Sequence, residues 1–146
     1  MTSKFSTTIS INSDAATIWA NLTNPELMTK WMGELEMKIE IETDWKVNSP
    51  MIIRGFHHVE FENKGTILQY DKEKKLSYNH LSSISRLQNK TENYSILEFT
   101  LTPLEKFTLL TLDISNFPTD SIRKHLEFYW KTTIITIKEM IESQTH

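Results

Sequence analysis

The chain has 146 residues, the usual size of one folded domain, so we expect residues 1–146 to form a single domain. Its formal net charge of −3 gives no basic surface for nucleic acid, and the absence of cysteine excludes disulfides, thiolate catalysis and cysteine-ligated metals. No apolar run approaches the roughly 20 residues that a membrane span needs, and we expect a cytoplasmic protein.

The first part of the chain predicts one strand followed by two short helices. β-branched and aromatic residues at 5–11 are typical of a strand. The side-chain oxygens of Asn12, Ser13 and Asp14 suit the start of a helix at 15–22. Pro25 favours the first turn of a second helix, which we expect to end at Gly33.

From Leu35 the spacing of apolar residues changes to two, which predicts antiparallel strands. Leu35–Trp45 alternates apolar with acidic side chains, as a half-buried strand with one acidic face would. Further strands are expected at 51–57, 65–71, 76–81, 94–102 and 107–115. The connections are too short for a crossover helix, so neighbouring strands run antiparallel.

The last element is a long helix, expected at 121–142. Its apolar residues recur every three or four positions and are Ile122, Leu126, Tyr129, Trp130, Ile134, Ile137 and Ile141. Such a stripe must be buried, and the sheet offers the surface for it. The order of elements therefore predicts an α+β fold, an antiparallel sheet of about six to seven strands with the helices on one face.

Several segments resemble those of one known family. They are Ile11–Thr23, Asn24–Met32, Gly65–Asp71 followed by Lys75–Tyr78, Thr108–Leu112, and the helix around Trp130. The first two are similar to the family's x-x-x-V-W-x-A-L-T and D-P-E-L-x-x-x-W-W motifs, and the third to G-x-V-x-x-x-D-P-P-x-x-L-x-Y. This family comprises the bacterial homologues of the heat-shock-protein ATPase activator, within the START-like (SRPBCC, helix-grip) superfamily.

The resemblance implies a curved antiparallel sheet that grips the long C-terminal helix, with two short helices after the first strand. It also implies a ligand cavity between sheet and helix. The superfamily includes binding proteins, carriers and a minority of enzymes, so the shared fold does not by itself name a function.

The histidines are the first candidates for metal binding or catalysis. In a strand, the neighbours His57 and His58 would point to opposite faces and could not chelate one metal together. His58-Val-Glu60 matches half of a zinc-deaminase signature, but the required cysteine pair is missing. We therefore expect neither a metal nor a cofactor, and no catalytic residue is assigned.

The candidate ligand site consists of Tyr78, His80, Phe99 and Trp130. Tyr78 and His80 share a strand face with apolar Leu76, Phe99 alternates with leucines on a neighbouring strand, and Trp130 lies midway along the helical stripe. His80 could bind a polar ligand group or act as a general base, whereas the simpler interpretation is a core histidine bonded to a backbone carbonyl. Trp130 could line a cavity or simply pack in the core.

Two charged features are open to more than one interpretation. The acidic series Glu36, Glu40, Glu42 and Asp44 is most simply a solvated strand face, although paired carboxylates can also do acid–base chemistry. Arg54 would anchor an anion if it faced the core, and would merely cover the sheet if it faced outward.

Three functions follow, in order of preference. The first is a cofactor-free binding module for a small apolar or amphipathic molecule held between the sheet and the C-terminal helix. The second is a protein-interaction domain, similar to the chaperone activator that names the family, with a chaperone or another protein as partner. The third is a cyclase or dehydratase that uses Tyr78 and His80, although no residue spacing requires such chemistry.

Overall fold

The computed structural model describes residues 4–144, apart from the side chain of Ile84. The strands are β1 (Lys4–Ile11), β2 (Glu40–Thr43), β3 (Pro50–His57), β4 (Val59–Asp71), β5 (Lys75–Ser82), β6 (Ser95–Pro103) and β7 (Thr108–Ser115). The α-helices are α1 (Ala15–Thr23), α2 (Pro25–Met32) and α3 (Asp120–Ser143), and the short 3₁₀ turns are η1 (Leu35–Met37), η2 (Ser83–Ser85) and η3 (Thr91–Asn93). No helix in this part of the chain is both long and apolar enough to cross a membrane.

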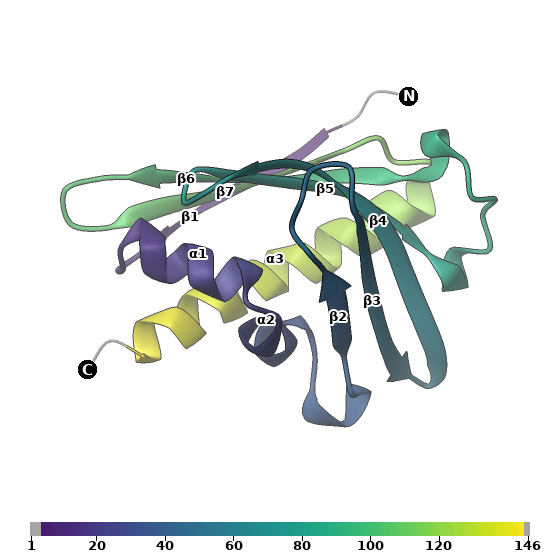
Figure 1. Cartoon of the computed structure of the whole chain (residues 1–146), viewed down its shortest axis with the longest axis horizontal. Helices are drawn as coiled ribbons and strands as arrows, with labels where there is room; N and C mark the ends of the chain where they lie inside the picture. Colours follow the sequence, from purple (N-terminus) through teal and green to yellow (C-terminus); the bar gives the residue numbers. More distant parts are fainter. Residues whose placement is uncertain (1–3, 145–146) are drawn as a thin grey trace.

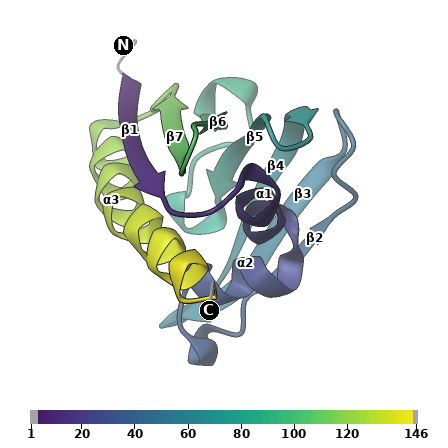
Figure 2. The same ribbon diagram turned by 90° about the vertical axis from the view of Figure 1, so that its left-hand side faces the viewer.

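All seven strands form one antiparallel sheet in the order β1-β7-β6-β5-β4-β3-β2. The sheet is strongly curved, with β2, β3 and β4 steeply inclined to β1, β6 and β7 (Figure 1). All three α-helices lie on the concave side, where α3 passes along the sheet and α1 and α2 fill the space towards β2 (Figures 1 and 2). The expected α+β helix-grip architecture is confirmed.

The core lies between the concave face and α3. Alternate residues of β6 and β7 are buried, as period-two strands with one covered face require. The buried residues of α3 are Leu126, Trp130, Thr133, Ile134, Ile137 and Ile141. The predicted helical stripe is therefore confirmed, although Ile122 and Tyr129 are only half-buried.

Polar contacts fix the helices to one another and to the sheet edge. The indole N–H of Trp31 donates to the carbonyl oxygen of Asn21 at 2.9 Å, and that of Trp45 donates to Thr23 at 2.8 Å. At the far end of α3, the Glu142 carboxylate accepts from the backbone N–H of Asn12 at 2.9 Å. These bonds satisfy buried donors and join α3 to the end of β1.

Two predicted strand boundaries are wrong. Residues 35–38 form the 3₁₀ turn η1 and a left-handed residue, Lys38 (φ 48°), so the acidic strand begins only at Glu40. Conversely, β4 begins at Val59 rather than at Gly65, because His58 (φ 66°) turns the chain tightly from β3 into β4. The alternation of residue types indicated neither turn, since both depend on left-handed residues that are not glycine.

The buried stripe of α3 provides a direct test of the packing. Replacing Ile137, which is 0% exposed, with alanine is expected to lower the free energy of unfolding by about 2–4 kcal/mol, since it removes buried methylenes and leaves a void. The matched variant Ile135→Ala changes a residue of the same type on the same helix that is 49% exposed, and should cost less than ~0.5 kcal/mol. Equilibrium urea denaturation measures both, and equal costs would contradict the packing.

Candidate functional site

The structure brings three of the four predicted site residues into one aromatic row. Ring centroids are 6.1 Å apart for Tyr78 and Phe99, and 5.5 Å apart for Phe99 and Trp130. Trp130 continues the row to Trp31 of α2 at 5.9 Å and is only 5% exposed. Phe99 and Trp130 thus pack against each other, and Trp130 also packs against α2. His80 lies two residues beyond Tyr78 on β5 and is half-buried.

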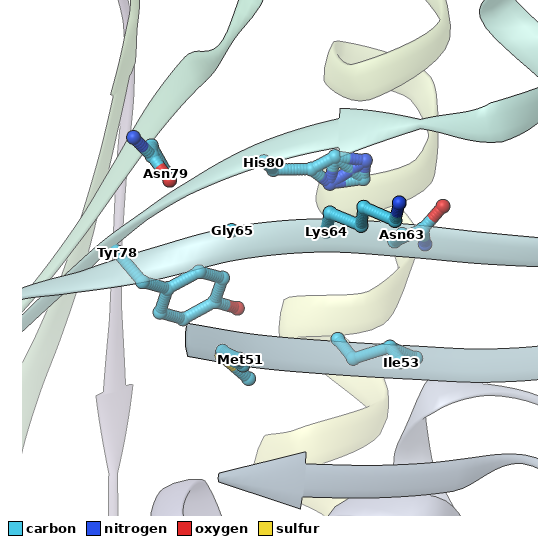
Figure 3. A pocket seen from close by; sticks show the side chains of 8 residues that line it. All are labelled: Met51, Ile53, Asn63, Lys64, Gly65, Tyr78, Asn79 and His80. Carbon is cyan, nitrogen blue, oxygen red and sulfur yellow. The ribbon is translucent and has the colours of Figure 1, made fainter. Parts of the chain in front are cut away.

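A small hollow of about 10 Å³ opens on β3, β4 and β5 beside this row (Figure 3). Its lining residues are Met51, Ile53, Asn63, Lys64, Gly65, Tyr78, Asn79 and His80. The volume suffices for one water-sized group. Tyr78 and His80 border the hollow, whereas Phe99 and Trp130 do not.

Gly65 sets the shape of the sheet beside this hollow. A Cβ atom on residue 65 would lie 1.9 Å from the carbonyl oxygen of Asn79, so only glycine allows β4 and β5 to approach this closely. Strand pairing is irregular there: Lys64 pairs with Leu81 and Ile67 with Tyr78, and the Thr66 N–H donates instead to Oδ1 of Asn79 at 2.6 Å. The hollow therefore lies where the pairing of β4 with β5 is interrupted by a shift in register.

Three of the polar residues that line the hollow, Asn63, Tyr78 and His80, have side-chain groups without a hydrogen-bond partner among the described residues. Among the described residues, Oδ1 of Asn63 is the buried side-chain atom that has no hydrogen-bond partner. Neither the Tyr78 hydroxyl nor the His80 ring makes a hydrogen bond to another described residue. Of the four tryptophans, Trp130 alone makes no indole hydrogen bond within residues 4–144. Buried polar groups are normally satisfied, so the unpaired Oδ1 of Asn63 distinguishes this hollow.

Burial keeps Tyr78 and His80, two of the titratable residues that line the hollow, uncharged at neutral pH. Removal from water, together with the nearby Tyr129, raises the pKa of the Tyr78 hydroxyl far above its usual value. Removal from water, reinforced by His125 of α3, lowers the pKa of His80 to about 4. The site therefore offers neutral hydrogen-bonding groups. Both interpretations of His80, a ligand-binding group and a core histidine, place its ring away from water, as the lowered pKa indicates.

Asn63 and Gly65 are site residues that the sequence did not reveal. Asn63 was missed because the predicted strand began at residue 65, which left its orientation undefined. Gly65 carried a usable signal, since an isolated glycine within a strand pattern often marks a bulge or a close approach of two backbones.

The other charged candidates lie outside the hollow. Arg54 faces away from the core and pairs with Glu42 and with Glu62, the latter at 2.9 Å. The acidic residues 36, 40, 42 and 44 are all exposed, as a solvated face should be. The rings of His57 and His58 meet edge to face at 4.7 Å at the hairpin tip. No group of three or more metal-ligating side chains occurs within the described residues.

A roomier groove of about 190 Å³ lies between the start of α1 and the β6–β7 hairpin. Two of its polar groups already have partners: the Asp14 carboxylate accepts from the Thr17 N–H at 2.7 Å, and the Ser13 carbonyl accepts from the Thr108 hydroxyl at 2.9 Å. Volume alone does not make a site, and this groove lacks the unsatisfied groups of the smaller hollow.

We compared the sequence with models of known protein families. Residues 12–142 match the model of the family described as activator of Hsp90 ATPase homolog 1-like protein. The chain belongs to this family. The match confirms the resemblance inferred from the motifs, and it includes every residue of the hollow and of the aromatic row. A search of curated proteins gave no match.

Solved structures of similar proteins share the fold of this activator-like chain. A Cytophaga hutchinsonii protein is 29% identical, with a TM-score of 0.81 over 97% of this chain and 95% of that one. A Chromobacterium violaceum protein is 13% identical, with a TM-score of 0.79 over 96% and 98%. A structure described as the Aha1 dimer from Colwellia psychrerythraea is 19% identical, with a TM-score of 0.76 over 99% of both chains.

The lowered pKa of His80 predicts how stability depends on pH. In the unfolded chain a histidine binds a proton near pH 6.5, whereas folded His80 resists protonation down to about pH 4. The unfolded state therefore binds more protons in this interval, and stability falls as the pH drops from about 6.5 to about 4. This fall in the free energy of unfolding is expected to be on the order of 1–2 kcal/mol, because His80 is only half-buried and solvent screening reduces the effect. We expect His80→Gln to abolish it.

The measurement is urea denaturation of both proteins at several pH values between 4 and 8. His57→Gln is the matched control, because His57 is exposed and its substitution should leave the pH profile unchanged. Parallel profiles for wild type and His80→Gln would show that His80 is not buried in its neutral form.

Proposed function

We propose that this protein is a cytoplasmic binding domain for a small amphipathic molecule. The polar group of the ligand would occupy the hollow beside Tyr78 and His80, and its apolar part would lie against the aromatic row of Phe99 and Trp130. The observation that carries the proposal is the set of polar groups without internal partners, above all the buried Oδ1 of Asn63. A ligand that supplies hydrogen bonds to such groups gains more than it would at a surface.

The size of the hollow sets a condition on this function. About 10 Å³ admits a single water-sized group, so a ligand tail requires side chains at the sheet–helix interface to move apart. Ile53 and His80 are among the lining residues that are only half-buried, and we place the entry for a ligand beside them. Binding by displacement of side chains is common at ligand sites even where the backbone moves little.

Tryptophan fluorescence tests the location of the ligand. The uncharged dye Nile red is expected to bind and to quench part of the tryptophan emission, and Trp130→Phe should remove most of this quenching because Trp130 borders the proposed tail position. The matched control Trp45→Phe should leave the quenching intact, since Trp45 packs against Tyr70 at a centroid distance of 5.9 Å, away from the row. Absence of binding, or equal effects of both variants, would contradict the proposal.

A second candidate function is recognition of a protein partner, and one surface feature favours it. Large apolar side chains are exposed at the end of the molecule formed by η1 and the β3–β4 hairpin: Leu35 is 93% exposed, and Phe56 and Val59 are about half exposed. The two segments lie side by side, because a Cβ atom on Gly55 would lie 3.2 Å from the carbonyl oxygen of Met37. The family description suggests an Hsp90-type chaperone as the partner.

Recognition of a protein partner predicts that substitutions at the end formed by η1 and the β3–β4 hairpin reduce chaperone binding. If it holds, the protein should bind an Hsp90-family chaperone and raise its ATPase rate, and Leu35→Ser combined with Phe56→Ser should reduce the effect at least fivefold. Phe128→Ser is the control, because Phe128 is also exposed (77%) but lies on α3. No change in the ATPase rate with the wild-type protein would exclude this function.

A further inference from the structure

The groups around the hollow restrict the kind of ligand more sharply than its size does. Asn63 offers an amide oxygen, Tyr78 a hydroxyl, and His80 one donor and one acceptor nitrogen. Each of these groups is neutral. A head group that both donates and accepts, such as a hydroxyl or a carboxamide, could pair with all three.

The hollow has no buried charged side chain to compensate an ion. Lys64 is the one lining residue with a permanent charge, but its side chain is 54% exposed and its Nζ lies 3.7 Å from the carboxylate of Glu62. Arg54, on the adjacent strand, is held by Glu42 and Glu62 on the outer face. On the helix side, the Tyr129 hydroxyl donates to the Met32 carbonyl at 2.6 Å, and His125 is exposed.

An ionised head group would therefore lose its hydration without gaining a buried counter-ion, since the exposed Lys64 already lies near Glu62. A carboxylate would also place its charge beside the unpaired oxygen of Asn63, which repels it. An ammonium group could donate to that oxygen, but among the residues that line the hollow it would find no carboxylate. Both ions pay a desolvation cost that a neutral hydroxyl or amide avoids.

We infer that the site selects amphipathic ligands with an uncharged, hydrogen-bond-donating head group, such as alcohols and primary amides, over carboxylates and ammonium ions of the same chain length. The donor of the head group pairs with Oδ1 of Asn63, and its oxygen accepts from Tyr78 or His80. This inference rests on the proposed binding function and specifies its ligand class.

A matched series of eight-carbon probes tests the selectivity. Octan-1-ol, octanamide, octanoate and octylammonium share one tail and differ only in the head group, and each is titrated against Nile red bound to the wild-type protein at pH 8. The alcohol and the amide are expected to displace the dye at concentrations at least tenfold lower than octanoate and octylammonium. Asn63→Leu, which replaces the unpaired amide with an apolar side chain of similar size, should remove most of this difference.

The outcomes separate the inference from the function on which it rests. If octanoate or octylammonium binds as tightly as the alcohol, the selectivity is overturned while the binding function stands. If neither Nile red nor any probe binds, the binding function itself fails. If neutral probes are preferred but Asn63→Leu, shown by its melting curve to be folded, keeps the full preference, the assignment of the donor to Asn63 is overturned.

Discussion

The concave face of the sheet and the apolar stripe of α3 bury each other. The rest of the fold depends on this contact. Exposure of either surface to water would be unfavourable, because each is apolar. The buried residues of β6 and β7 lie on one face of the sheet, and those of α3 form a single stripe. Fully burying a large apolar side chain contributes about 1.5–3 kcal/mol relative to exposure, so the stripe outweighs the charge pairs on the outer face of α3. The curvature of the sheet follows, because a curved sheet surrounds a helix more completely than a flat one.

This packing explains why polar groups are satisfied almost everywhere except near β4 and β5. Where α1 and α2 meet, the indole groups of Trp31 and Trp45 find backbone carbonyls. At the irregular pairing around Gly65 the ladder is distorted, and the side chain of Asn79 is occupied by the Thr66 N–H. The neighbouring groups of Asn63, Tyr78 and His80 are left with a hollow instead of a partner. A defect of this kind costs stability, which is common at functional sites.

Much of the fold could be predicted from the sequence, because long periodic segments carry strong signals. The stripe from Leu126 to Ile141 indicated α3, and the β-branched and apolar residues of Tyr94–Thr102 and Phe107–Ser115 indicated the interior strands β6 and β7. The prediction of a strand at Leu35–Lys38 was wrong, because the residues of this 3₁₀ turn alternate in the same way as those of a half-buried strand.

The candidate site was harder to predict than the fold. Tyr78 and His80 were found because their strand register was evident, whereas Asn63 was not, because its orientation depends on pairing with Ser82 across a hairpin and on a bulge. Whether a buried polar group has a partner depends on contacts distant in sequence, and no local pattern contains that information.

The two candidate functions use one structural element at its opposite ends. Strands β3 and β4 carry Ile53 and Asn63 at the hollow, and the same hairpin carries Phe56 and Val59 at its exposed tip. The hairpin is held on one side by Arg54, which joins Glu42 of β2 to Glu62 of β4, and on the other by the pairing of β4 with β5, which is interrupted at Gly65 and Thr66. Paired residues border this interruption on both sides, Lys64 with Leu81 and Ile67 with Tyr78, and the hollow lies between them. The exposed tip and the hollow therefore belong to the same two strands but consist of different residues.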